Sequence, residues 1–450
     1  MLFSRILRGE KRGYSLKAMV QLFPGIDILV PQTVLTYLGF LLNFWWLWLP
    51  LFLFIIFFQT WMYYIQRQWR ASVPFILLEI KPPKEIEQSP KIVESIFAAI
   101  WAISGTVSTK LDKYLKGMTQ HFMTFELVGI SGEIKFLVRT PAIFRNLIET
   151  KIYAEYPKAE ISEAEDYVDN IPTGVLDRDW DLWGSVLQLA RENPYPIKTY
   201  NEFVDILPKQ PFIDPISNLM EALAKLRSGE QVWIQIFTRP AADSWIADGK
   251  KIVAKLMGKP AAKKQSIINE IISGWGAALG AVLEELFSGK PALPIASGKD
   301  QKPELPSMMM HLSPGEKEVI DMIEKKMTKK AFECKINLLY FGRQDLFFKP
   351  TVSSIMGFFN QFATLNLNGF RPNPRFTTKA FYAMAGKRLA FKKRVILRLC
   401  RQRTFWEKGF ILNTEELASL WHFPSISVEA PMMPQVEAKK GTPPAGLPLA

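Results

Sequence analysis

The sequence has little of the chemistry on which metal proteins and disulfide-rich proteins depend. It contains two cysteines, Cys334 and Cys400, and three histidines among 450 residues. Neither a disulfide framework nor a Cys/His metal cluster can be built from so few ligands, and scarce cysteine is typical of reducing compartments. We therefore expect both thiols to be buried small apolar groups. We expect no metal and no resident cofactor.

Sequence motifs for nucleotide chemistry and hydrolysis are also missing. A phosphate-binding loop needs two glycines five residues apart, then Lys followed by Ser or Thr. Four Gly-Lys pairs are followed by Pro, Asp or Arg instead: Gly258-Lys259, Gly289-Lys290, Gly298-Lys299 and Gly386-Lys387. The chain also lacks the G-x-S-x-G, H-E-x-x-H and G-x-G-x-x-G patterns. We therefore predict a protein that is not an enzyme.

The few candidate acid and base residues have structural explanations. His121 stands just before a predicted strand and His422 just before Phe423-Pro424, where a packing or capping role is expected rather than general base catalysis. Four acidic residues cluster near one short predicted strand: Glu160, Glu163, Glu165 and Asp166. Acids at such a position are typical of a solvated face, so they do not predict a metal site.

Charge is absent from Ile28 to Gln66, a stretch rich in Leu, Ile, Phe and Trp. Such a run is typical of a membrane segment, because each central apolar residue contributes about −0.3 to −0.6 kcal/mol to insertion. It is too long for the apolar region of a signal peptide, and no small-residue cleavage site follows it. We predict an anchor that stays in the mature protein and contacts the lipid bilayer.

Aromatic residues favour a hairpin within this anchor. The residues expected to hold it in the membrane are Trp45, Trp46, Trp48, Trp61 and Tyr64. A single span from Tyr37 to Trp61 would place the first three near mid-membrane, whereas tryptophan prefers the interface. A turn at Asn43 to Pro50 would move them to the far interface. A single helix stays open as the alternative, because each hairpin limb would have only about 17 residues.

Both flanks of the anchor are basic, with Arg5, Arg8 and Lys11 before it and Arg67 and Arg70 after it. Basic residues are retained on the cytoplasmic side of a membrane. The sequence therefore predicts an inner or plasma membrane protein whose globular part is cytoplasmic.

The region after the anchor has the pattern of an α+β fold. Its elements are predicted as a strand at 75–80, a helix from Ser89, a strand pair at 122–130 and 133–139 across Ser131-Gly132, a helix from Pro141 and a strand at 159–165. The order β-α-β-β-α-β predicts a ferredoxin-like unit. Ser131-Gly132 is a two-residue hairpin signal.

A second copy of this unit is predicted downstream. Its elements are a strand at 197–200, a helix at 215–226, a strand at 231–239, a helical insertion at 241–313, a helix at 314–327 and a strand at 333–341. The last helix and strand match 145–152 and 159–165 in pattern, which indicates a duplication. A helix at 351–363 and a short helix capped by Asn413 and Glu416 follow.

These patterns divide the chain into consecutive regions. They are a basic N-terminal segment at 1–27, a transmembrane hairpin or helix at 28–66, a first ferredoxin-like domain at 67–170, a second at 171–345 with its insertion at 241–313, a basic helical region at 346–428 and a Pro-rich tail at 429–450.

The basic helical region is the candidate binding site. No acidic residue lies between Leu346 and Trp406. The candidate residues for nucleic-acid or partner binding are Lys387, Arg388, Lys392, Lys393, Arg394, Arg398, Arg401 and Arg403. Lys387, Arg394, Arg398 and Arg401 recur at steps of seven, four and three, which places them on one helical face. That face could be a solvated or partner-docking surface, could hold nucleic-acid phosphates, or could bind anionic lipid beside the anchor.

Short motifs over nearly the whole chain after the first 30 residues resemble one bacterial family. In the first half they are Trp48-Leu49-Pro50, Leu77 to Pro82, Lys91 to Phe97, Gly132-Glu133-Ile134, Arg139-Thr140-Pro141 and Ile152 to Pro157. In the second half they are Asp181 to Gly184, Trp233 to Gln235, Leu365 to Phe370, Asn413 to Leu420, His422 to Pro424, and Glu437 to Gly441 with Pro443-Pro444. The chain thus resembles the membrane-anchored N-terminal region of conjugation-like type IV secretion proteins.

In that family the region can precede a HerA/FtsK-type motor ATPase, with the Pro-rich motif at the junction. The resemblance therefore implies a membrane-anchored scaffold or docking subunit that works with a separately encoded HerA/FtsK-type ATPase, in a homo-oligomeric ring at the inner membrane. The alternative is a membrane-tethered protein that binds DNA through the basic helix.

Overall fold

The chain divides into two units in the computed structural model. One unit contains residues 1–73 and 107–119, and the other contains 74–106 and 120–450. Within them, the structure describes residues 45–83, 86, 89–106, 110–170, 179–203, 214–257, 312–382, 384–405 and 408–425. The predicted basic N-terminal segment, the first hairpin limb, most of the insertion and the Pro-rich tail therefore lie outside the described residues.

The first unit contains one long apolar helix, α5 (Trp45–Ser72). Its part from Leu49 to Ser72 is long and apolar enough to cross a membrane; at 1.5 Å per residue it extends about 36 Å, against about 30 Å of hydrocarbon. Trp46, Trp61 and Tyr64 are exposed along it. Because the helix already begins at Trp45, the predicted turn from Asn43 to Pro50 is wrong from Trp45 onward.

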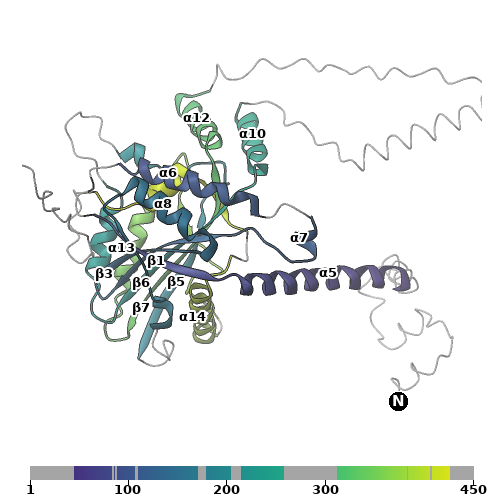
Figure 1. Ribbon diagram of the computed structural model, residues 1–450, viewed down its shortest axis with the longest axis horizontal. Coiled ribbons are helices and arrows are strands. Elements are labelled where there is room, and N and C mark those ends of the chain that lie inside the picture. The colour runs from purple at the N-terminus through teal and green to yellow at the C-terminus, as the bar shows by residue number, and fades with distance from the viewer. Residues whose placement is uncertain are drawn as a thin grey trace, which may run out of the picture. The chain divides into compact units, whose positions relative to one another are not determined.

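A short helix, α7 (Lys110–Tyr114), belongs to the same unit as α5 (Figure 1). The ring of Tyr114 lies 6.0 Å from the ring of Phe58. Gly117 lies directly on the α5 backbone with φ +66°, and a Cβ on it would be 2.5 Å from the carbonyl carbon of Ile65. Only glycine fits both this conformation and this contact.

The second unit is built on a nine-stranded antiparallel sheet. Its strands are β1 (Phe75–Lys81), β2 (Met123–Ile130), β3 (Glu133–Pro141), β4 (Glu160–Glu163), β5 (Trp180–Leu189), β6 (Gln231–Pro240), β7 (Ala331–Arg343), β8 (Phe370–Pro372) and β9 (Phe410–Asn413). Their order is β4-β1-β3-β2-β6-β7-β5-β8, and β9 pairs with the start of β7. The α+β prediction is confirmed.

The first half of the sheet follows the predicted succession of elements. The chain runs through β1, α6 (Lys91–Ile100), β2, β3, α8 (Arg145–Glu155) and β4, with short 3₁₀ turns and α7 between them. Ser131 and Gly132 both have positive φ, 53° and 93°. This is the conformation that a two-residue type I′ hairpin requires, and the hairpin prediction is confirmed.

The second half departs from the prediction. The predicted strand at 197–200 is absent, and Tyr200–Phe203 forms a 3₁₀ helix, η4. The first strand of this half is instead β5. The sequence did not predict it, because most of its residues are buried, and apolar and polar residues alternate only weakly along it. β7, predicted as the last strand, pairs directly with β6. The later elements α13 (Lys349–Asn360) and β8 complete this half, with α9 (Ser217–Ala224) between β5 and β6.

One strand pair joins the two halves. β2 and β6 run antiparallel from Met123 opposite Thr238 to Ile130 opposite Gln231. The two halves therefore share one sheet, which is continuous across this pair. The physical reason is that each half would otherwise expose a long apolar edge strand with unpaired N–H and C=O groups.

The helical insertion leaves and re-enters the sheet between β6 and β7. Its described helices are α10 (Ser244–Leu256), within the predicted insertion at 241–313, and α12 (Pro314–Thr328), which corresponds to the helix predicted at 314–327 in the second ferredoxin-like copy. They pack through Val253, Ile320 and Ile323, which form a small cluster separate from the main core.

Helices cover both faces of the sheet (Figure 1). The larger core contains buried side chains from α6, α8, α9, α13 and α15 (Thr414–Leu420) on one face. The smaller core on the opposite face contains Ile396, Leu397 and Cys400 of α14 (Ala385–Gln402). Successive strand residues point to opposite faces, so β2 contributes Phe125 and Leu127 to the first core and Val128 to the second.

Substitution of Phe97 in α6 would test the packing of the larger core. Its ring is fully buried and lies 4.7 Å from the ring of Phe125 and 6.5 Å from that of Trp421. We expect Phe97→Ala to lower the free energy of unfolding by about 3–5 kcal/mol, because it leaves a cavity between α6, β2 and α15. Urea denaturation of the full chain in detergent would measure this. Phe391→Ala, at an exposed phenylalanine, is the matched control; equal losses in the two variants would contradict the assigned core.

Candidate functional site

Helix α14 carries most of the predicted binding residues and is held firmly against the sheet. Its buried face packs on β5 and β7 through Ile396, Leu397 and Cys400. Gly184 of β5 permits the close approach, since a Cβ there would lie 2.9 Å from Cγ1 of Ile396. The basic helix predicted from the sequence is therefore a helix with one packed face, and its opposite face is open to ligands.

Three of the predicted residues hold the helix in place. Lys392 donates hydrogen bonds to the carbonyl oxygens of Pro374 and Lys379, both at 2.9 Å. Lys393 forms an ion pair with Asp181 of β5. Arg388 donates to the carbonyl of Phe381 at 3.0 Å. Because these donors are engaged within the fold, we assign them to positioning of the helix.

Arg403 is not a surface residue. It ends α14 in the left-handed conformation, with φ +45°, and is 2% exposed. Its Nε lies 3.0 Å from Oε1 of Glu126, and its Nη1 lies 2.6 Å from Oδ2 of Asp166. Its inclusion among the binding residues is therefore wrong. Burial acts to lower the pKa of Arg403, but the contacts with Glu126, Tyr167 and Asp166 together outweigh it and raise the pKa, so the guanidinium stays charged.

The buried arginine meets a row of polar side chains across three strands. Glu126 of β2 lies opposite Gln235 of β6, which lies opposite Asn337 of β7. The hydroxyl of Tyr167 donates to Oε2 of Glu126 at 2.7 Å, and Nε2 of Gln235 donates to the Tyr167 oxygen at 2.9 Å. Gln235 also donates to the carbonyl of Cys400 at 3.0 Å. The C-terminal end of α14 is thus hydrogen-bonded to the middle of the sheet.

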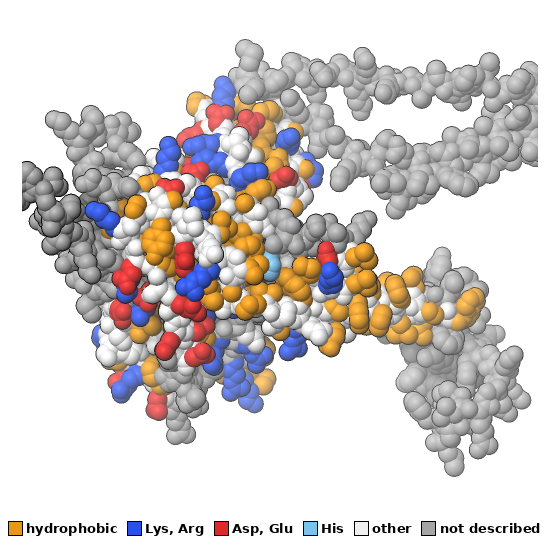
Figure 2. Space-filling model, viewed as in Figure 1, with side chains coloured by type: hydrophobic (Ala, Val, Ile, Leu, Met, Phe, Trp, Pro, Cys, Tyr) orange, Lys and Arg blue, Asp and Glu red, His pale blue; other side chains and the backbone are white. Residues whose placement is uncertain are grey.

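Four cations remain available on α14, and we call Lys387, Arg394, Arg398 and Arg401 the basic stripe. All four side chains are exposed, and none of them forms a hydrogen bond or ion pair with another residue that the structure describes. Figure 2 shows Lys and Arg side chains gathered over α14. Phe391 lies on the same face, one turn from Lys387, and is 66% exposed. An apolar ring within an unpaired cationic stripe can bind an extended anionic ligand.

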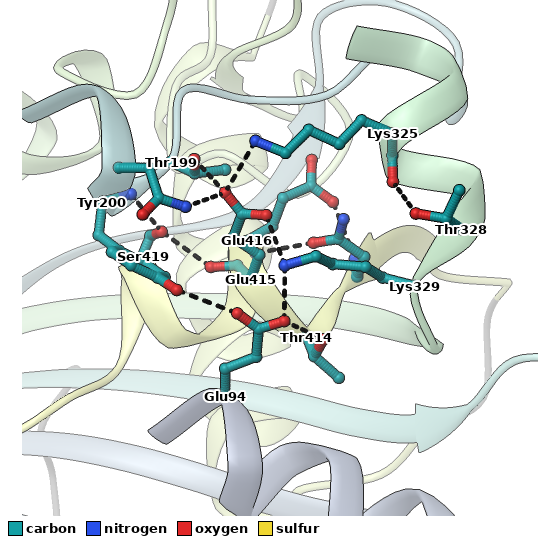
Figure 3. A network of polar contacts seen from close by, with 12 residues as sticks. Glu94, Thr199, Tyr200, Lys325, Thr328, Lys329, Thr414, Glu415, Glu416 and Ser419 are labelled. Atoms are coloured by element: carbon teal, nitrogen blue, oxygen red, sulfur yellow. Dashed lines mark hydrogen bonds and ion pairs between the residues drawn. The ribbon is translucent and has the colours of Figure 1, made fainter. Parts of the chain in front are cut away.

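A second polar cluster, which sequence reasoning missed, joins α12 to α15 and α6 (Figure 3). Lys329 contacts Glu94 and Glu415, each at 2.7 Å. Glu415 also accepts from the hydroxyl of Thr199 at 2.7 Å. Burial acts to raise the pKa of Glu415, but these hydrogen bonds outweigh it and hold the pKa below its ordinary value. The only sequence signal was the capping pair of Asn413 and Glu416, which α15 confirms.

Beside this cluster, Lys326 and Glu416 form a fully buried ion pair at 3.1 Å. Lys326 also donates to the carbonyl of Ile411 at 2.9 Å. The space lined by these groups is about 10 Å³, which is room for about one water molecule. The cluster therefore fixes the end of α12, and it has no room for a substrate.

The other candidate residues are also engaged in the fold. Burial raises the pKa of both thiols, that of Cys400 to about 12, and lowers the pKa of His121. Of the acidic cluster, Glu163 pairs with Arg145 at 3.0 Å and Glu160 with Lys81 at 3.6 Å. Among the described residues, no three His, Cys, Asp or Glu side chains converge as metal ligands.

His422 is paired with a residue far away in the sequence. Its Nε2 lies 2.8 Å from Oδ1 of Asp214, and its Nδ1 lies 2.8 Å from the carbonyl oxygen of Ala418. Asp214 also accepts from the backbone N–H of Ser425 at 2.8 Å. This buried pair ties the segment before α9 to the end of α15, a packing role of the kind expected for this histidine.

Comparison with known proteins gives a family but no described function. A family model described as a domain of unknown function, DUF8128, matches residues 68–435. No curated protein matches the chain. The matched range includes the whole sheet, both helical layers and the basic stripe.

We expect the Arg403 ion pair to dominate the stability of the α14 face. Arg403→Met leaves the Glu126 carboxylate buried without its counter-charge, so the free energy of unfolding should fall by about 3–5 kcal/mol. Urea denaturation of the full chain in detergent measures this loss. The double variant Arg403→Met with Glu126→Leu should recover much of it, because the carboxylate that remains, that of Asp166, is partly exposed to solvent. Arg401→Met, two residues away and exposed, is the matched control with an expected change within about 0.5 kcal/mol; no recovery in the double variant would contradict the pairing.

Asp214 should make stability depend on pH. Burial acts to raise the pKa of Asp214, but the charge and hydrogen bond of His422 outweigh it, so the pKa lies below 3.8. A lowered pKa contributes stability above the ordinary value, and this is lost as the pH falls through the folded-state value. We expect Asp214→Asn to destabilise the chain at pH 6, and the gap from the wild type to shrink towards pH 3. Thermal unfolding across this range measures it, and a gap that stays constant would refute the assignment.

Proposed function

The chain belongs to the DUF8128 family, and we propose that it is a membrane-anchored docking subunit that presents the basic stripe of α14 to an anionic partner. One observation carries this proposal. Lys392, Lys393 and Arg403 hold α14 on the sheet, while the four cations of the stripe have no partner within the described chain. The helix is therefore fixed in position by some of its basic side chains, while the unpaired basic side chains of the stripe are available to bind an anionic partner.

The anchor in this proposal is α5, with its basic end in the cytoplasm. Leu49 to Ser72 has the length and composition of a membrane span, and Arg67 and Arg70 lie at its C-terminal end. Basic residues at a helix end favour the cytoplasmic side. We place the protein in the inner or plasma membrane with the sheet in the cytoplasm.

The sheet supports a scaffold role. Its two halves have the same internal strand order, β4-β1-β3-β2 and β8-β5-β7-β6, and they meet through their equivalent strands β2 and β6. Each order is that of a ferredoxin-like unit. We therefore propose that the second half of the sheet is a duplicate of the first, with a helical insertion between β6 and β7. A continuous sheet covered on both faces gives the stripe a rigid base.

The partner we propose is a separately encoded HerA/FtsK-type ATPase in a type IV secretion or conjugation-like translocation machine. This follows from the resemblance of the sequence motifs, and the subunit would assemble as a homo-oligomer around the motor. An acidic surface on the ATPase would complement the basic stripe.

DNA is the second candidate ligand, and Phe391 is the observation that favours it. Single-stranded nucleic acid is held by cations along its backbone and by aromatic rings on which bases stack. Phe391 lies between Lys387 and Arg394 on the exposed face and could stack in this way.

One pair of variants tests both candidates. The stripe variant replaces Lys387, Arg394, Arg398 and Arg401 with Gln, and the matched control replaces the exposed Lys91, Lys158, Lys250 and Lys317 with Gln. Both lose the same charge. For an ATPase partner, we expect the wild-type chain and the control to co-purify with a phosphate-binding-loop ATPase from detergent-solubilised membranes, and the stripe variant to lose it.

The DNA alternative is measured by salt titration of oligonucleotide binding to the full chain in nanodiscs. If the stripe binds single strands, the slope of log affinity against log salt should fall by about three in the stripe variant and should change far less in the control. Binding of both ligands at wild-type strength by the stripe variant would refute the docking proposal.

A further inference from the structure

The segment that follows residue 109 lies along the apolar helix of the first unit. We call residues 110–118 the α7 segment. It touches α5 at two points: the ring of Tyr114 lies tilted at 6.0 Å from that of Phe58, and Gly117 lies on the backbone of Ile65. Ile65 is the one α5 residue buried among those whose side chains the structure describes. Phe58 and Ile65 are seven residues apart, so the segment follows one face of α5 over two turns, about 10 Å.

These two contacts place the α7 segment beside the part of α5 between Phe58 and Ile65. Between Phe58 and Ile65 the helix carries Trp61, Tyr63 and Tyr64. Tryptophan and tyrosine concentrate at the headgroup level of a bilayer. If α5 spans the membrane, the α7 segment therefore lies beside the aromatic belt, at the boundary between headgroups and acyl chains.

The outer surface of the segment suits that boundary. Leu111 and Leu115 are 66% and 65% exposed, and the backbone N–H of Leu115 donates to the carbonyl of Leu111 at 2.9 Å. The two leucines thus lie one helical turn apart, on the same side. Lys113 is also exposed and lies 5.4 Å from the ring of Tyr114. In water, two leucines exposed to this extent would be unfavourable, whereas lipid would cover them.

Charge favours an anionic membrane surface. The charged residues of the α7 segment are Lys110, Asp112, Lys113 and Lys116. Asp112 is neutralised by Lys116 at 2.9 Å. The segment therefore has a net positive charge, to which the exposed Lys113 contributes, and a basic residue next to an anionic leaflet is attracted by about 1 kcal/mol.

We propose that the α7 segment is a second membrane contact, which inserts Leu111 and Leu115 at the headgroup level and binds anionic phospholipid through Lys113. This inference rests on the proposed role of α5 as a membrane anchor. It adds a peripheral contact in the plane of the interface to the anchor that crosses the bilayer.

Site-directed fluorescence in vesicles tests the proposal. The full chain is reconstituted in vesicles of phosphatidylcholine and phosphatidylglycerol, and a cysteine introduced as Leu115→Cys is labelled with an environment-sensitive dye. The native Cys334 and Cys400 are fully buried and do not compete for the label. We expect strong quenching by phospholipids that carry a nitroxide near the headgroup, and weaker quenching when the nitroxide lies at the acyl end.

Two control positions separate this inference from the anchor itself. Phe54→Cys, exposed on α5, should be quenched by the deep nitroxide, and Phe348→Cys, exposed beyond the C-terminal end of β7 in the second unit, should be quenched by neither. Quenching at position 54 with none at position 115 would overturn the membrane contact of the α7 segment and leave the anchor intact. No quenching at position 54 would overturn the anchor, and with it the premise of this inference.

Two further variants test the mechanism of contact. Gly117→Ala should reduce quenching at position 115 without changing position 54, because a Cβ cannot fit against Ile65. Lys113→Gln should reduce the extra quenching that phosphatidylglycerol gives over phosphatidylcholine alone, whereas Lys158→Gln should not. Quenching at position 115 that is unaffected by both variants would refute the assigned geometry.

Discussion

The ion pair between Arg403 and Glu126 is the interaction on which the arrangement around α14 depends. Glu126 lies in β2, the strand through which the first half of the sheet meets the second. Its carboxylate is buried, so the fold is stable only if a cation reaches it. Arg403 reaches it from the last turn of α14, and Asp166 and Tyr167 complete its surroundings. A side chain that ends the basic helix therefore also stabilises the join between the halves of the sheet.

This constraint explains why the basic residues of one helix differ in role. A helix repeats every 3.6 residues, so residues a few positions apart face the sheet, its rim or solvent. Arg403 faces the sheet, Lys392 and Lys393 reach carbonyls and a carboxylate at the rim, and Arg394 and Arg398 face outwards. Net charge alone would treat them as one patch. Some of these cations hold α14 in place and others have no partner, and this division of roles gives the docking surface a fixed orientation.

Local signals in the sequence predicted much of the fold. The Ser131-Gly132 hairpin, the capping pair of Asn413 and Glu416 and the apolar pattern of α6 act between near neighbours, and each is present in the structure. β5 was missed because a strand buried on both faces has no alternation to detect. The join of β2 with β6 was missed because edge pairing depends on which strands meet in space.

The candidate site was predictable to a similar extent. Helical spacing identified the face of α14 that stays exposed, since Lys387, Arg394, Arg398 and Arg401 follow one another around the helix. Spacing also places Arg403 on the packed face, three residues after Cys400 and seven after Ile396, but it could not show which buried carboxylate Arg403 meets. The pairing of His422 with Asp214 and of Lys326 with Glu416 was equally hidden, since the partners are far apart in the sequence.

The position of the helical insertion has a consequence for how this chain tolerates change in length. The insertion leaves after Pro240 and returns where Pro240 pairs with Phe332, so its two ends are already held together by the sheet. For a connection whose ends are held together in this way, doubling the length costs only about 0.6 kcal/mol in closure entropy. The middle of the insertion can therefore lengthen or shorten between related chains at little cost to the fold. The last turn of α12 cannot, because Lys326 and Lys329 neutralise the buried carboxylates of Glu416 and Glu415.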